Sequence, residues 1–183
     1  MMKHAKRRWV VAGLLAVAAA GAALVSLTPA GAQTSRTTTP RCGTRALEVW
    51  IGVGTGGGQA GGVAYPLEFT NVTDHACHLE GFPGVSAQLS GHQIGSAAQR
   101  DHSVAPQLVT IAAGKTAHAV LTITNVSALS GCHPVTAEGL SVYPPDAFTA
   151  ADVPYKFQAC STAGPSFLSI QVVEPRVGVP GHS

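Results

Sequence analysis

Charged and aromatic residues are scarce in this chain of 183 residues, of which Asp, Glu, Lys and Arg make up 11% and Phe, Trp and Tyr 5%. Four of its eleven Lys and Arg lie within residues 1–32, which contain no acidic residue. The rest of the chain carries seven basic and nine acidic side chains, a net charge of 7 − 9 = −2. So few cations cannot form the basic surface that binds a phosphate backbone, and this excludes a nucleic-acid-binding protein.

After residue 32 the chain also lacks methionine, a CxxC cysteine pair and any amphipathic helical period longer than two turns. The first absence removes the usual axial ligand of a blue-copper site, and the second removes a common zinc-site spacing. The third argues against an α/β fold. The 151 residues that remain (183 − 32) suit one domain with a sizeable core.

The first 32 residues have the three parts of an export signal. A basic stretch from Lys3 to Arg8 precedes an apolar run from Trp9 to Leu27, and Ala30-Gly31-Ala32 is a small-x-small cleavage site. We predict a signal peptide over residues 1–32, cleavage between Ala32 and Gln33, and a mature chain without a membrane span. An uncleaved anchor is the alternative, because the apolar run reaches the roughly 18 residues of a membrane span.

Export determines how the cysteines are interpreted. Cys42, Cys77, Cys132 and Cys160 form an even set, and two disulfides are expected in an oxidising compartment. Three connectivities exist. We favour Cys42 with Cys77 and Cys132 with Cys160, which closes two loops of roughly 30 residues, each stabilising the fold by about 3 to 4 kcal/mol on the chain-entropy argument.

Short segments of alternating apolar and polar residues dominate the mature chain. The clearest cover residues 47–53, 63–70, 117–124 and 167–173, and shorter ones cover 78–80, 85–89, 108–111 and 139–143. Turns rich in Gly and Pro separate them. About eight such strands predict an all-β fold, an antiparallel two-sheet sandwich. Pro66 within the second segment indicates an edge strand or a bulge.

The two ends of the mature chain differ from its centre. Residues 33–41 are polar and rich in Thr, with nothing to bury, and predict a disordered tether. The domain is expected over residues 42–174, with a C-terminal tail over 175–183.

The stretch from Cys77 to Val85 reads CHLEGFPGV, and LEFTN at 67–71, GSAAQR at 95–100 and AAGKTA at 112–117 accompany it. With these features the chain resembles the actinobacterial secreted family known as domain of unknown function 4232, over about residues 42–174. The resemblance implies an immunoglobulin-like sandwich in the cell envelope or outside the cell. It implies no activity and supplies no catalytic residues.

Motifs of nucleotide-binding proteins and hydrolases are incomplete here. The Gly-rich run at 52–62 and Gly114-Lys115-Thr116 both lead into strands, whereas a phosphate site needs a following helix. The nearest approach to GxSxG, Gly84 to Gln88, lacks the closing Gly. We therefore predict no enzyme, no catalytic residue and no cofactor.

Histidine is the one unusual component, with seven residues in the mature chain. His75 and His78 flank Cys77, and together with His133 they are the candidates for a metal site. Solvated surface histidines are the favoured interpretation. An exported metal-binding protein is kept as the alternative function.

Trp50, the only tryptophan after residue 32, shares its strand face with Glu48 rather than with the apolar Leu47 and Val49. It caps the edge of the core or marks a contact surface for a partner. The leading hypothesis is a secreted or cell-envelope β-sandwich that acts as a non-catalytic binding or structural module, with an unidentified envelope or extracellular partner.

The export signal predicts the mass of the secreted protein. Expressed in its host, the chain is expected in the culture supernatant with Gln33 as its first residue, because signal peptidase cuts after the small residue Ala32. Intact-mass spectrometry checks this. A cell-bound chain that retains residues 1–32 would contradict it.

Overall fold

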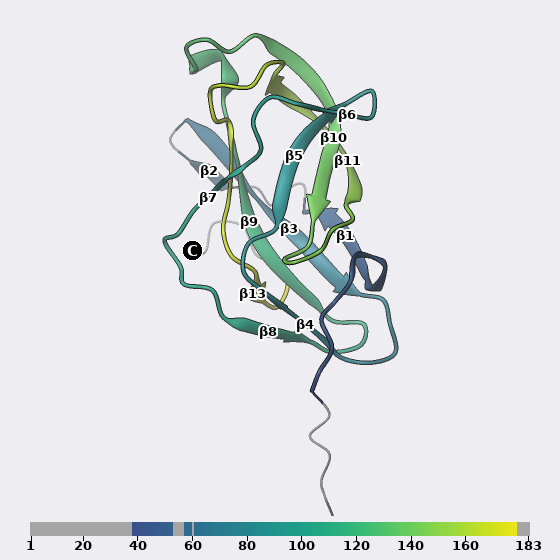
Figure 1. Ribbon diagram of the computed structural model, residues 1–183. Coiled ribbons are helices and arrows are strands. Elements are labelled where there is room, and N and C mark those ends of the chain that lie inside the picture. The colour runs from purple at the N-terminus through teal and green to yellow at the C-terminus, as the bar shows by residue number, and fades with distance from the viewer. Residues whose placement is uncertain (1–37, 53–56, 60, 179–183) are drawn as a thin grey trace, which may run out of the picture. The chain divides into compact units, whose positions relative to one another are not determined.

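The computed structural model describes residues 38–52, 57–59 and 61–178, which form layers of β-strands without an α-helix (Figure 1). The predicted signal peptide, its cleavage site after Ala32 and residues 33–37 lie outside the described residues. The all-β prediction is confirmed. Among the described residues, no helix has the length and apolar character needed to cross a membrane.

The larger sheet has seven strands. Its main order is β1 (Leu47–Ile51), β3 (Gly62–Asn71), β9 (Thr116–Thr124), β12 (Leu168–Ile170) and β7 (Gln99–Arg100), while β2 (Gly57–Gln59) pairs with β3 and β13 (Glu174–Pro175) with β9. Among the described strands of this sheet, β12 and β7 form the one parallel pair.

The smaller sheet has the order β11 (Ala151–Cys160), β10 (Pro134–Tyr143), β5 (Gly84–Leu89) and β6 (His92–Ile94). A third pair joins β4 (Cys77–Glu80) to β8 (Leu108–Ile111). Two 3₁₀ helices, η1 (Thr44–Ala46) and η2 (Val126–Ala128), complete the elements.

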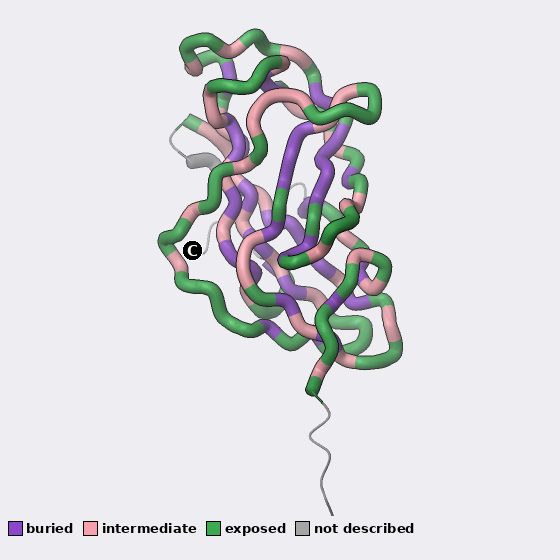
Figure 2. The backbone as a smooth tube through the Cα atoms, in the orientation of Figure 1, coloured by how far each residue is buried: buried purple, intermediate pink, exposed green. Residues whose placement is uncertain are grey.

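The core lies between the two larger sheets, where alternate residues of each strand meet. β3 and β9 contribute Leu67, Phe69 and Leu121, and the opposite sheet contributes Leu140 and Val142, all fully buried. Figure 2 shows buried stretches along the strands of both layers. Because successive side chains of a strand point to opposite faces, this alternation is the physical origin of the period-two pattern in the sequence.

The structure contains more strands than the eight or so expected from the sequence, and the largest omission is β11. Its alternating side chains are Val153, Tyr155, Phe157 and Ala159. Pro154 lies within it, which is compatible with a strand because β11 is at the edge of its sheet. The other additional strands are two or three residues long.

The prediction for Pro66 is wrong. β3 is an interior strand between β1 and β9, and its register with β9 runs without a shift through the pair Pro66–Val120. Pro66 instead lies where β1 ends: the Gly52 amide donates to the Pro66 carbonyl, and proline has no N–H to return the bond. The missing donor therefore ends the β1–β3 ladder.

Residues on both sides of the predicted domain make contacts with it. The last residues of the predicted tether are held against β4, because the carbonyls of Thr39 and Pro40 accept hydrogen bonds from the His78 side chain and amide. Arg41 forms an ion pair with Asp146. At the other end, residues 174–178 are docked on the larger sheet, and residues 179–183 lie outside the described part of the chain.

The four cysteines form two disulfides, Cys42–Cys77 and Cys132–Cys160. This is the connectivity favoured by the sequence. The first bond joins the start of the domain to β4, and the second joins the residues before β10 to the end of β11.

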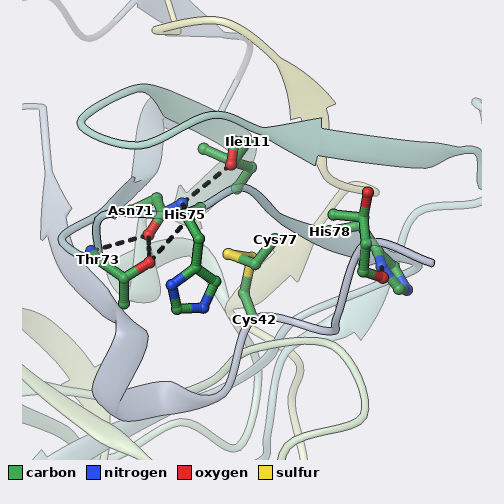
Figure 3. The surroundings of a disulfide bond; sticks show 8 residues. Cys42, Asn71, Thr73, His75, Cys77, His78 and Ile111 are labelled. Carbon is green, nitrogen blue, oxygen red and sulfur yellow. Dashed lines mark hydrogen bonds between the residues drawn. A yellow bond between two sulfur atoms is a disulfide. The ribbon is translucent and has the colours of Figure 1, made fainter. Parts of the chain in front are cut away.

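Beside the first disulfide, the fully buried Asn71 holds the turn between β3 and β4 (Figure 3). Its Nδ2 group donates to the carbonyls of His75 (2.8 Å) and Ile111 (3.0 Å). Its Oδ1 atom accepts from the amide and the hydroxyl of Thr73. An apolar side chain cannot replace these bonds, of which the one to the Ile111 carbonyl is buried.

Asn71→Ala is expected to lower the free energy of unfolding by about 3 kcal/mol, because it removes four hydrogen bonds, one of them to the buried Ile111 carbonyl. Asn125→Ala is the matched control, since the side chain of the exposed Asn125 accepts one bond, from the Ser127 amide, and its loss costs about 1 kcal/mol. Urea denaturation of the disulfide-intact proteins measures both. Equal losses would contradict the special role of Asn71.

Candidate functional site

An open groove of about 470 Å³ lies where the ends of β3 and β9, the helix η2 and the strand β11 meet. Its lining residues are Gly61, Gly62, Val63, Tyr65, Ile123, Thr124, Asn125, Val126, Tyr155, Phe157 and Gln158. Two other hollows of about 400 Å³ among the described residues contain no aromatic side chain.

Three partly exposed aromatic rings form a row along this groove. The rings of Tyr65 and Tyr155 meet edge to face with centroids 5.4 Å apart, and those of Tyr155 and Phe157 stack at 5.9 Å. Phe157 in turn contacts the buried Phe167 at 6.5 Å. Such pairs are favourable arrangements of ring quadrupoles, so the core holds the row in a fixed orientation.

The groove is polar but uncharged, because none of its lining residues is Asp, Glu, Lys, Arg or His. Burial, and then the hydrogen bond and charge of Tyr65, raise the pKa of Tyr155 to about 12, so its hydroxyl stays neutral. The Oδ1 atom of Asn125 is occupied by the Ser127 amide. Its Nδ2 group has no partner in the described part of the chain, and it can donate to a ligand.

Trp50 lies on the opposite face of the larger sheet, away from the core. It is 39% exposed, its indole N–H donates to the Thr70 hydroxyl at 3.1 Å, and it is not part of the hydrophobic core. The alternative that Trp50 caps the core edge is therefore wrong. Trp50 on β1 lies opposite Glu68 on β3, and Glu68 lies opposite His118 on β9.

Glu68 is a buried carboxylate on this outer face. It is 1% exposed, its Oε1 atom accepts the Gly178 amide at 2.9 Å, and its Oε2 atom is buried without a partner. Loss of hydration raises the pKa of Glu68 from 4.5 to about 7, and the bond from Gly178 opposes part of this rise. The sequence placed Glu68 on the polar side of a strand and gave no sign that it is covered.

The candidate metal ligands do not form a cluster. His75 and His78 lie on opposite sides of the Cys42–Cys77 disulfide (Figure 3). His75 pairs with Asp74, and His133 lies elsewhere, directly before β10. In the described ranges, no group of three or more His, Cys, Asp or Glu residues is positioned to hold a metal ion.

Two other motifs from the sequence lie in a turn and in a strand. Gly114 and Lys115 lie in the turn between β8 and β9, with a left-handed Gly114 (φ of 67°), and Thr116 begins β9. The residues from Gly84 to Gln88 form most of β5. Of the Gly-rich run at 52–62, residues 53–56 and 60 lie outside the described residues.

The aromatic groove was not anticipated from the sequence. One signal was available: Tyr155 and Phe157 alternate with polar residues along β11, as the residues of a half-buried strand do. Their meeting with Tyr65 requires the two sheets to pack, and sequence spacing alone does not contain that information.

Comparison with known proteins identifies one family. The family model described as Domain of unknown function (DUF4232) matches residues 42–174. Searches of curated proteins and of solved structures find no match. The matched residues include the whole groove and Glu68, and they end at Glu174, before the segment that covers Glu68.

Glu68 makes stability depend on pH. Between pH 4.5 and about 7, Glu68 keeps a proton in the folded chain that it has lost in the unfolded chain. The free energy of unfolding is therefore highest below pH 4.5, as far as Glu68 contributes to it, and this stabilisation is lost as the pH rises through 7. The loss is expected to reach up to about 3 kcal/mol.

Glu68→Gln retains the acceptor for Gly178 but cannot titrate, and it is expected to flatten the fall in unfolding free energy between pH 5 and 7.5. Glu48→Gln is the control, since Glu48 is exposed on the same face. Urea titrations at several pH values compare the three proteins. A slope that is the same in wild type and Glu68→Gln would contradict the assignment.

Proposed function

The chain belongs to the DUF4232 family, and we propose that it is an exported, non-catalytic binding module whose aromatic groove holds an uncharged glycan. The observation that carries this proposal is the row of partly exposed rings, Tyr65, Tyr155 and Phe157, in a groove without charged side chains.

Export is supported by the covalent structure and by the sequence before the domain. Two disulfides persist in oxidising compartments and are rare in the cytosol. Residues 1–32 have the composition of a signal peptide. The protein therefore meets its ligand in the cell envelope or outside the cell.

A binding role is supported by the cost of presenting aromatic rings to water. Small-molecule sites combine apolar and aromatic walls with a few polar groups that fix orientation. The groove has this composition, with Asn125, Gln158 and the tyrosine hydroxyls beside the rings. The buried core between the two sheets stabilises the sandwich, and this does not require three adjoining rings to be partly exposed at its edge.

The class of ligand follows from the charge and the amphipathic walls of the groove. An ionic ligand would leave a charge without a partner. A sugar presents C–H bonds on its faces, which the electron-rich faces of aromatic rings attract, and hydroxyl groups at its edges, which amides and phenols bind. A neutral glycan therefore matches the rings and the polar groups together.

The absence of catalysis is supported by the same lining. Hydrolysis of a glycosidic bond uses two carboxyl groups on either side of it. None of the described residues that line the groove is a carboxylic acid, a histidine, a cysteine or a lysine. The groove therefore has no general acid or base with a pKa near neutrality.

Wild-type protein is expected to bind members of a panel of neutral oligosaccharides more tightly than the corresponding uronic acids. Tyr155→Ala removes the central ring of the row and is expected to weaken binding at least tenfold. Isothermal titration calorimetry measures both. Trp50→Ala is the control, because Trp50 exposes a ring of similar chemistry on the other face of the larger sheet.

Unchanged affinity in Tyr155→Ala would refute the groove as the site, and loss of affinity in Trp50→Ala alone would assign binding to the outer face. Equal affinity for neutral and acidic sugars would refute the class of ligand. If no member of the panel binds, the glycan proposal fails.

A further inference from the structure

A short C-terminal segment, Pro175–Gly178, lies over the outer face of the larger sheet. It begins in β13, which pairs with β9 through only two residues, Glu174 opposite His118 and Pro175 opposite Ala117 (Figure 1). The backbone then turns at Arg176, whose φ of 75° is left-handed. The turn directs Gly178 across the sheet toward β3.

The sheet contacts this segment through its backbone. His118 donates from Nδ1 to the Arg176 carbonyl at 3.0 Å, and the Gly178 amide donates to Oε1 of Glu68 at 2.9 Å. The side chains of Pro175, Arg176 and Val177 are exposed. Recognition therefore depends little on the identity of these three residues.

At one position the sheet accepts only glycine. A Cβ atom on Gly178 would lie 2.5 Å from Cβ of Pro66, 2.7 Å from Cδ2 of His118 and 2.9 Å from its Cγ atom. Pro66 is a rigid ring, and His118 is fixed by its bond to the Arg176 carbonyl. A side chain at this position cannot be accommodated without displacing the segment.

The segment nevertheless fits imperfectly. It satisfies Oε1 of Glu68 and leaves the buried Oε2 atom without a donor, an arrangement that costs on the order of 1 to 3 kcal/mol. A non-glycine residue in left-handed conformation at Arg176 adds about 1 kcal/mol. The family match ends at Glu174, so residues 175–178 lie outside the matched part of this chain.

We propose that Pro66, Glu68 and His118 form a peptide-binding slot, that residues 175–178 occupy it within the same chain, and that a glycine-bearing peptide from a separate chain can replace them. One residue of the ligand offers its carbonyl to His118, as Arg176 does. The residue two positions later offers its N–H to Glu68, as Gly178 does, and this residue must be glycine. A further donor from the ligand can satisfy Oε2. The slot is separate from the aromatic groove on the opposite side of the sheet.

The tethered segment holds the slot closed because its effective concentration is high, in the millimolar range for a short linker. Gly178→Ala is expected to release it and to leave the slot open in the full-length protein. The probe is a fluorescent synthetic peptide with the sequence of residues 174–183, and fluorescence anisotropy measures its binding.

The peptide is expected to bind the Gly178→Ala protein at least tenfold more tightly than the wild type, whose slot is occupied. A peptide with alanine in place of Gly178 is expected not to bind. Adding Glu68→Leu to the Gly178→Ala protein removes the acceptor and is expected to weaken binding at least tenfold. Adding Glu48→Leu is the matched control on the same face and is expected to leave binding unchanged.

The proposal is overturned if a Gly178→Ala protein with both disulfides formed does not bind the glycine peptide, if the alanine peptide binds equally well, or if Glu68→Leu has no effect. If Gly178→Ala does not fold, hydrogen exchange in the wild type decides the question.

The Gly178 amide is expected to exchange by local opening, faster than the amides of β9. Exchange only through global unfolding would make the segment an integral part of the fold and refute the slot.

Discussion

The pairing of β3 with β9 is the constraint on which the rest of the structure depends. The two strands are in register at nine positions, from Gly62–Thr124 to Thr70–Thr116. This register directs Leu67, Phe69 and Leu121 into the core and Glu68 and His118 to the outer face. Because side chains alternate along a strand, a slip of one residue would exchange the two faces and bury the polar set in the core.

Both surfaces with functional potential follow from this register. On the inner side Tyr65 reaches the open edge between the sheets, where the rings of β11 complete the aromatic row. On the outer side Glu68 and His118 become neighbours across the ladder and contact the backbone of the C-terminal segment. One sheet therefore supports an aromatic, uncharged groove on one side and the proposed peptide slot on the other, and the two sites do not share side chains.

The two disulfides and Asn71 act around the periphery of this sheet rather than within it. One bond attaches the first residues of the domain to β4, and the other joins the chain before β10 to the end of β11. Asn71 supplies four hydrogen bonds at the turn into β4. Loops at the ends of strands bury little apolar surface, so covalent and polar links provide the order that packing provides in the core.

The sequence by itself indicated the fold class, most of the long strands, the number of disulfides and the family, because alternation, cysteine parity and a local motif are short-range properties of the chain. Among three possible disulfide pairings it favoured the one that the structure contains. It missed β11 and misplaced Pro66 as an edge or bulged residue. Only the tertiary structure decided that Tyr65 meets Tyr155 and that Glu68 is buried. The physical reason is that burial on the outer face depends on which segment returns to cover it: Gly178 is 110 residues from Glu68 in the sequence, and no local pattern encodes their contact.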